Sequence, residues 1–194
     1  MRLSGTRLNG LTAVALVLGL AACGSGGEVA EPEARSTDVA TQAASDVPGK
    51  IAVANLQDAQ GKAIGTATAT QGADTLTVSL RVEGLSPGDH GVHVHTVGKC
   101  DGPKFESAGA HLNPGNRQHG IENAQGQHVG DMPNLTVGKD GRGTVTYPLK
   151  GGSIDALLDS DGSALVIHAK PDDQKTDPSG DSGDRIACGV FTPG

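Results

Sequence analysis

The sequence predicts an all-β domain, a sandwich or barrel with a core of small aliphatic side chains. Its 194 residues include 30 glycines, no tryptophan and only 2% aromatic residues. No long stretch shows the 3.6-residue apolar period of an amphipathic helix. This composition is typical of antiparallel sheets whose many short strands are joined by tight turns.

Six short segments rich in Val, Thr and Ile carry the strand signal, since their apolar and polar residues partly alternate. The sequences between them, such as "DAQGK", "SPGD" and "GKDGRG", hold the glycine and aspartate residues that turns require. We therefore expect strands over residues 50–57, 63–70, 74–84, 90–97, 143–149 and 163–170.

The first residues predict an export signal. Arg2 and Arg7 precede an apolar run of about 10 to 14 residues, shorter than the roughly 20 that a membrane-spanning helix needs. The run ends in "LAAC", which resembles the lipobox of bacterial lipoproteins. We expect a signal peptide over 1–22 and a lipidated Cys23; an ordinary cleavage site beside an accidental cysteine is the weaker alternative.

The remaining chain divides into a tether and one domain. Residues 24–47 are small, polar and acidic and cannot bury enough surface to fold, so 23–47 is expected to be the lipidated cysteine and a disordered tether. Residues 48–194 then form the domain. The protein is expected to be exported and lipid-anchored to the bacterial cell membrane, facing the periplasm or the cell exterior.

The charge of the mature chain argues against nucleic acid as a partner. Without Arg2 and Arg7, the basic residues fall from 15 to 13 against 22 acidic ones, so the net charge is −9 rather than −7. An anionic substrate would need a local positive field to approach such a chain.

The cysteines predict a disulfide. The chain has three, which would leave one unpaired in an exported protein. If Cys23 carries lipid, Cys100 and Cys188 remain, and an oxidising compartment favours a bond between them.

Histidines gather in two regions. In the expected strand 90–97, His93 and His95 share one face and leave Val92 and Val94 for the core. A His-x-His pair alone is more often a solvated polar pair, and a single histidine such as His168 is more often a structural residue. The evidence that these histidines form a metal site comes from the long loop that follows them in the sequence.

That loop, residues 100–132, is rich in Gly, Pro and Asn, and a long loop in a compact domain is usually functional or disordered. Its three imidazoles and one carboxylate can form a closed tetrahedral zinc site. Copper suits imidazole ligands as well, and a redox metal fits the strand histidines better. The candidate ligands in the loop are His111, His119, His128 and Asp131.

The segments "GVHVHTVGKC", "SAGAHLNP", "HVGDMPN", "LVIHAKPDD" and "GDRIACGV" occur in an order that resembles a copper/zinc superoxide dismutase, and a bacterial lipoprotein-type member in particular. The resemblance covers about residues 50–194. It implies an eight-stranded Greek-key β-barrel or sandwich with a metal-binding loop and an electrostatic loop. It also implies copper and zinc ions as cofactors and superoxide as substrate.

The same resemblance assigns roles to single residues. Copper would be bound by His93, His95, His111 and His168, and zinc by His111, His119, His128 and Asp131. Asp172 would join a copper ligand to a zinc ligand, as such carboxylates do when they orient imidazoles. Arg185 would guide the anion, Cys100 and Cys188 would form the disulfide of the family, and His90 would be structural.

Several points stay open at this level. Lys175 lies where the family often places cationic guides, yet five aspartates surround it in the sequence, so Arg185 is the one guide that we expect. The family in bacteria includes monomers and homodimers.

The expected function is disproportionation of superoxide by Cu(II)/Cu(I) cycling, with His111 as bridge and proton donor, in protection of the cell envelope. The alternative is a copper-binding or copper-buffering surface lipoprotein of the same fold with little turnover. Arg185 favours the enzyme, because a metal store needs no guanidinium beside an open coordination position. A purely structural sandwich would leave the histidines unexplained.

Overall fold

The computed structural model describes residues 49–194, so the predicted signal peptide (1–22) and lipidated tether (23–47) lie outside the described residues. Within the described part, nine strands form one antiparallel sheet with only two short helical turns. The strands are β1 (Ile51–Asp58), β2 (Ala63–Gln71), β3 (Leu76–Glu83), β4 (Gly88–His90), β5 (Val92–His95), β6 (Leu135–Val137), β7 (Arg142–Leu149), β8 (Ala164–His168) and β9 (Arg185–Pro193). The helical turns are η1 (Glu106–Ala108) and α1 (Ile154–Leu157).

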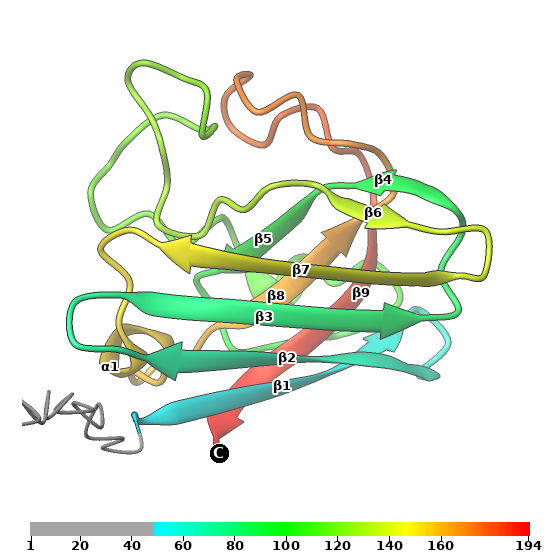
Figure 1. The fold of residues 1–194 in the computed structure, drawn as a ribbon, viewed down its shortest axis with the longest axis horizontal. Coiled ribbons are helices and arrows are strands. Elements are labelled where there is room, and N and C mark those ends of the chain that lie inside the picture. The colour runs from blue at the N-terminus through cyan, green and yellow to red at the C-terminus, as the bar shows by residue number, and fades with distance from the viewer. Residues whose placement is uncertain (1–48) are drawn as a thin grey trace, which may run out of the picture. The chain divides into compact units, whose positions relative to one another are not determined.

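The sheet curls into a nearly closed barrel, as the predicted Greek-key fold requires. Its strand order is β4-β6-β7-β3-β2-β1-β9-β8-β5. In Figure 1, β1, β2, β3 and β7 cross the front and β5, β8 and β9 cross behind them. The two end strands, β4 and β5, are consecutive in the chain with only Gly91 between them, so the two edges of the sheet meet at this residue.

Gly91 also explains why the structure has nine strands where eight were expected. Its N–H donates to the Lys170 carbonyl at 2.8 Å and its carbonyl accepts from the His168 N–H at 2.9 Å, so the chain passes here from one sheet edge to the other. A Cβ at this position would lie 2.8 Å from the Ser182 Cβ, closer than side chains normally approach. The expected strand 90–97 is therefore divided at this residue.

The sequence pattern did not single out β6 and β9 as strands. β6 has only three residues. β9 lies between β1 and β8, and Ala187, Cys188 and Gly189 are buried in succession, which removes the apolar and polar alternation. A strand covered on both faces loses the period-2 signal.

The barrel interior is built from small aliphatic side chains, as expected. β3 shows the alternation most clearly, with Leu76, Val78, Leu80 and Val82 buried and the residues between them directed outward. Phe191 is the single Phe, Tyr or Trp among the fully buried members of this core within the described residues.

A second, smaller apolar cluster lies outside the barrel wall. Phe105 and Ala108 of the long loop pack over Ala164, Val166 and Cys188 of β8 and β9. His93 pairs with Val166 in the sheet register, so the β5 histidines share this outer face while Val92 and Val94 join the interior. The prediction that His93 and His95 lie on one face of this strand, and Val92 and Val94 on the other, is confirmed.

The two long loops, 100–132 and 171–184, lie at the same end of the barrel (Figure 1). The first covers the free edge of β5: the Val94 N–H donates to the Gly130 carbonyl at 2.9 Å, and the Val94 carbonyl accepts from the Leu112 N–H at 2.8 Å. Paired edges are protected from other chains. This pairing also brings His111 beside His95 and Asp131 beside His93.

The predicted disulfide between Cys100 and Cys188 is present, and its partners are 88 positions apart in the sequence. A loop of this length gives a chain-entropy stabilisation on the order of 4 kcal/mol. The bond attaches the start of the first long loop to β9. No helix in residues 49–194 is long and apolar enough to cross a membrane.

Candidate metal centre

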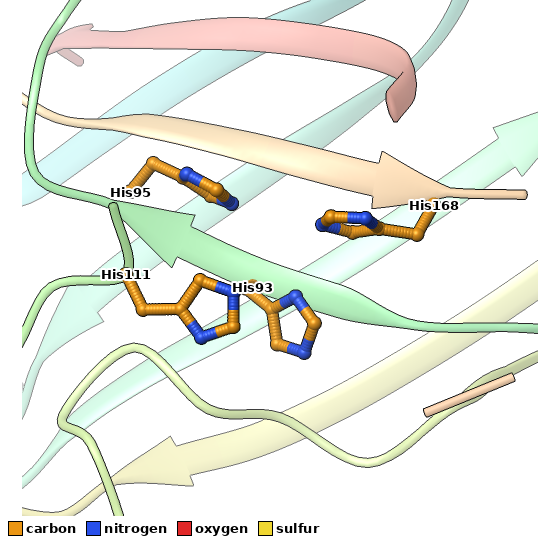
Figure 2. Close-up of side chains that lie close together, drawn as sticks. All are labelled: His93, His95, His111 and His168. Atoms are coloured by element: carbon orange, nitrogen blue, oxygen red, sulfur yellow. The ribbon is translucent and has the colours of Figure 1, made fainter. Parts of the chain in front are cut away.

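Four imidazoles from three parts of the chain meet on the outer face of β5. His93 and His95 come from β5, His168 from the end of β8, and His111 from the long loop (Figure 2). One ligand atom of each lies within 4.8 Å of one ligand atom of every other, and all four residues are buried. We call them the copper-side cluster, after the role expected for them.

Three of these rings are held by one nitrogen each. His93 Nε2 lies 2.6 Å from Asp172 Oδ2, His95 Nδ1 lies 2.9 Å from the Gly109 carbonyl, and His168 Nδ1 lies 3.1 Å from the Gly183 carbonyl. Because carbonyl and carboxylate oxygens only accept, the ring nitrogen facing each of them must carry the proton. The lone pair of a neutral ring is thereby placed on the other nitrogen.

The other nitrogens are free to bind a metal. His93 Nδ1, His95 Nε2 and His168 Nε2 are buried and have no hydrogen-bond partner among the described residues. A buried polar atom without a partner costs about 1 to 3 kcal/mol. A bound metal ion would satisfy all three lone pairs, and imidazole nitrogen is a ligand that copper and zinc both accept.

A second set, the zinc-side cluster, converges on one oxygen. Asp131 Oδ1 lies 3.0 Å from the Nδ1 of His119, 3.1 Å from that of His111 and 3.2 Å from that of His128. The Nδ1 atoms of His111 and His128 are 3.3 Å apart. Ligands about 2.0 to 2.1 Å from a tetrahedral zinc ion are roughly 3.3 Å from one another, so these separations fit such an ion.

Asp131 is itself fixed. Its second oxygen, Oδ2, accepts the N–H of Gly120 at 2.8 Å and that of His128 at 3.0 Å. Burial alone would raise the pKa of this carboxyl, but the hydrogen bonds from His111, His119 and Gly120 outweigh it and lower the pKa well below its usual value. The ligand oxygen is therefore ionised across the physiological pH range.

His111 belongs to both clusters. Its Nδ1 faces Asp131 and His128, which leaves Nε2 as the nitrogen for the copper-side cluster. Its ring lies against that of His93, with the centroids 3.9 Å apart. His93 also lies close enough to belong to both groups of potential ligands, but its Nε2 is bonded to Asp172, so His111 is the residue with one nitrogen for each set, as a bridging ligand requires.

Burial keeps the copper-side rings neutral in the metal-free protein. It lowers the pKa of His93 to about 3, although the bond to Asp172 opposes the shift, and that of His168 to about 4. The pKa of His95 is lowered well below its usual value and that of His111 is lowered, in both cases mainly by burial. Protons therefore compete weakly with a metal for these nitrogens at neutral pH.

His119 behaves in the opposite way. Burial disfavours its charged form, but hydrogen bonds to Asp131 and Asp172 outweigh this and raise its pKa to about 9 in the metal-free protein. Zinc binding at Nδ1 would replace one proton of this ring.

Asp172 joins the two clusters from behind, as the resemblance implied. It lies 2.6 Å from His93 Nε2 and 3.0 Å from His119 Nε2. Its backbone is held by Asn134, whose side chain accepts the Asp172 N–H and donates to the Asp172 carbonyl, both at 2.8 Å. Asn134 was not singled out in the sequence, where "PN" reads as turn chemistry.

Gly180 permits this arrangement. It has a φ of +62°, and a Cβ on it would collide with the Asp172 carboxylate and lie 2.8 Å from His119 Nε2. A side chain at this position would be strained by the backbone angle and would displace Asp172.

Arg185 lies beside the copper-side cluster and is rigidly held. It donates to the Phe105 carbonyl at 2.8 Å and to the Gly109 carbonyl at 2.7 Å. The Gly109 oxygen is the same atom that accepts from His95 Nδ1. One carbonyl therefore fixes both the proposed guide and a proposed copper ligand.

The remaining candidates lie outside the two clusters. The His90 ring lies between two backbone carbonyls, 2.8 Å from that of His168 and 3.0 Å from that of Ser86. Lys175 is exposed, and its Nζ lies 2.9 Å from a carboxylate oxygen of Glu122, a partner that the sequence did not indicate.

The pKa shifts predict how the metal-free protein responds to pH. His93, His95 and His168 bind protons near pH 6.5 in the unfolded chain but only at a much lower pH in the folded protein. The free energy of unfolding should therefore fall as the pH drops from 6.5 towards 4. The loss is on the order of 1 kcal/mol per pH unit for each ring. His119, with a raised pKa, should lose its contribution as the pH rises from 6.5 through 9. Denaturant unfolding of the metal-free protein should therefore show maximum stability near pH 6.5. Stability unchanged between pH 6.5 and 4 would contradict these shifts.

Comparison with known proteins gives a consistent result. The family model for copper/zinc superoxide dismutase matches residues 63–191. A Cu-Zn superoxide dismutase of Caulobacter vibrioides is 42% identical over 72% of this chain and 84% of its own length. A Cu-Zn superoxide dismutase of Aquifex aeolicus is 42% identical over 71% of this chain and 85% of its own length. The crystal structure of a superoxide dismutase-like protein of Bacillus subtilis has a TM-score of 0.66 at 41% identity, covering 72% of this chain and 97% of the other. The structure of the Cu/Zn superoxide dismutase of Brucella abortus has a TM-score of 0.62 at 29% identity, and the match covers 73% of this chain and 99% of the other. The chain belongs to the copper/zinc superoxide dismutase family.

Proposed function

We propose that this protein converts two superoxide anions and two protons to dioxygen and hydrogen peroxide. Copper would be held by the copper-side cluster and zinc by the zinc-side cluster. The observation that carries the proposal is the set of three buried ring nitrogens without a partner, on His93, His95 and His168, close to three further ring nitrogens that surround Asp131 Oδ1.

Copper, when bound, supplies the redox chemistry, since it can accept an electron from one superoxide and return it to another as it alternates between Cu(II) and Cu(I). The chain supplies a rigid frame of ligands. The fixed acceptors at Asp172, Gly109 and Gly183 keep each ring in one orientation, so the ligand atoms need not rearrange when the charge in the site changes.

His111 is proposed to manage one proton. Because its Nδ1 faces Asp131 and His128, Nε2 is the atom at which this ring would take up a proton and from which it would donate it towards the product. Burial lowers the pKa of the ring, which favours release of that proton at neutral pH.

Arg185 is proposed to guide the substrate. A guanidinium is charged at any physiological pH, and its planar fork suits a small anion. Two backbone carbonyls hold it next to His95, so its charge has a fixed position near the copper-side cluster. Lys175 is proposed to contribute less, because Glu122 offsets its charge.

The cellular setting is proposed from the sequence. The "LAAC" segment ending at Cys23 supports a lipid anchor on the bacterial cell membrane, with the domain facing the periplasm or the exterior. The disulfide between Cys100 and Cys188 is consistent with an oxidising compartment outside the cytoplasm. The protein would then remove superoxide at the cell envelope.

Metal content and turnover test this proposal together. The purified full chain should bind about one copper and one zinc, and superoxide consumption should be lost on chelation and restored by adding copper to the zinc-loaded protein. These results would be measured by plasma mass spectrometry and by a direct superoxide decay assay. Bound copper with negligible turnover would instead indicate the copper-buffering alternative.

The role of Arg185 predicts a specific salt dependence. In the Arg185→Glu variant, kcat/KM should fall by at least about 10-fold, because steering by local charge is worth about 10- to 1,000-fold in association rate. Added salt should slow the wild type and should have no effect on the variant, or accelerate it.

A matched control is Lys139→Glu, which makes the same change in net charge in the exposed turn between β6 and β7. The copper content of both variants should be measured, so that a lost metal is not mistaken for lost guidance. Unchanged kcat/KM in copper-loaded Arg185→Glu would refute the guidance role.

A further inference from the structure

Asp177, in the second long loop, contacts two members of the zinc-side cluster from outside. Its Oδ1 accepts the backbone N–H of His119 at 2.6 Å and lies 3.8 Å from His128 Nε2. The Asp177 side chain is half-exposed, whereas that of His128 is buried. One carboxylate of this loop thus faces two residues of the other loop.

The two nitrogens of His128 have different surroundings. Nδ1 faces the cluster, 3.2 Å from Asp131 Oδ1 and 3.3 Å from His111 Nδ1. If that lone pair binds zinc, the ring proton must be on Nε2, which faces Asp177. Within residues 49–194, Asp177 is the one carboxylate within 4 Å of this nitrogen.

The local backbone holds Asp177 in place. Asp173 Oδ1 accepts the N–H of Lys175 at 2.9 Å and that of Thr176 at 2.8 Å, which forms a turn immediately before Asp177. Asn123 connects the two loops at this point, because its side-chain nitrogen donates to the His119 carbonyl at 3.0 Å and to the Lys175 carbonyl at 3.1 Å. The position of the carboxylate is therefore set by both loops.

We infer that Asp177 is a positioning residue for zinc: its negative charge orients His128 and strengthens it as a ligand, beyond the backbone contact to His119. The inference rests on the proposed function in that zinc fills the zinc-side cluster. Metal-binding imidazoles usually turn their second N–H towards a carboxylate, a carbonyl or water, and loss of such a partner typically costs 10- to 100-fold in metal affinity. Asp172 lies on the corresponding side of His119 at hydrogen-bond distance, 3.0 Å from Nε2, whereas Asp177 faces His128 Nε2 at the longer ion-pair distance of 3.8 Å.

Two variants separate the charge from the backbone contact. Asp177→Asn keeps an oxygen that can accept the His119 N–H and removes the charge, whereas Asp177→Ala removes both. Asp181→Asn is the matched control, because Asp181 is exposed on the same loop and its side chain makes no hydrogen bond or ion pair with any described residue. Zinc affinity of the full chain would be measured by competition with a chelator, and exchange of the His119 amide by hydrogen–deuterium exchange.

Asp177→Asn should bind zinc about 10- to 100-fold more weakly with His119 amide exchange unchanged, and Asp177→Ala should show weaker binding together with faster exchange. Asp181→Asn should match the wild type. Wild-type zinc affinity in Asp177→Asn would overturn the inference. Loss of affinity accompanied by faster His119 exchange in that variant would also overturn it, because the carboxylate would then act through the backbone alone. A wild-type chain that binds no zinc would contradict the proposed function itself.

Discussion

The candidate metal centre depends on hydrogen bonds that hold one nitrogen of each of three copper-side rings and leave the other nitrogen free. Asp172, the Gly109 carbonyl and the Gly183 carbonyl each fix one imidazole. Since these acceptors cannot donate, they also determine the tautomer. Burial then keeps the rings neutral, so three lone pairs are directed to one place before any metal arrives.

The loops have to supply these acceptors, and the barrel has to support the loops. The first loop pairs with the free edge of β5, which brings Gly109, His111 and Asp131 to the strand histidines. The second loop brings Asp172 and Gly183; Asn123 attaches it to the first loop, and Asn134 attaches it to the segment just before β6. The disulfide at Cys100 and Cys188 fixes the first loop to β9, at whose start Arg185 lies. The proposed ligands, their hydrogen-bond acceptors and the proposed guide are thus connected through two loops and one barrel edge.

Much of this arrangement could be predicted because it has a side-chain signature. Alternation placed His93 and His95 on one face of a strand, and their outward direction is confirmed. The grouping of six histidines and Asp131 rested on the combination of strand pair, loop and family resemblance, and the structure brings all seven side chains together. The Cys100–Cys188 bond followed from counting cysteines and is present.

The features that could not be predicted from the sequence are mostly the positions and directions of backbone groups. The carbonyls of Gly109 and Gly183 have no signature in a sequence, because every residue has a carbonyl and only the fold decides where it points. Gly91 divides one expected strand because the chain passes there from one sheet edge to the other, and only the fold shows that Ser182 leaves no room for a side chain at this position. Asp177 was one of several loop aspartates, and only its distance from His119 and His128 distinguishes it.

The central claim is that the fold selects which nitrogen of each histidine binds metal. Crystals of the protein loaded with copper and zinc, measured at the absorption edges of both metals, test this most directly. The account predicts a copper peak bonded by His93 Nδ1, His95 Nε2 and His168 Nε2, and a zinc peak bonded by Asp131 and the Nδ1 atoms of His111, His119 and His128. Copper bonded through the opposite ring nitrogens, or zinc located away from Asp131, would contradict it.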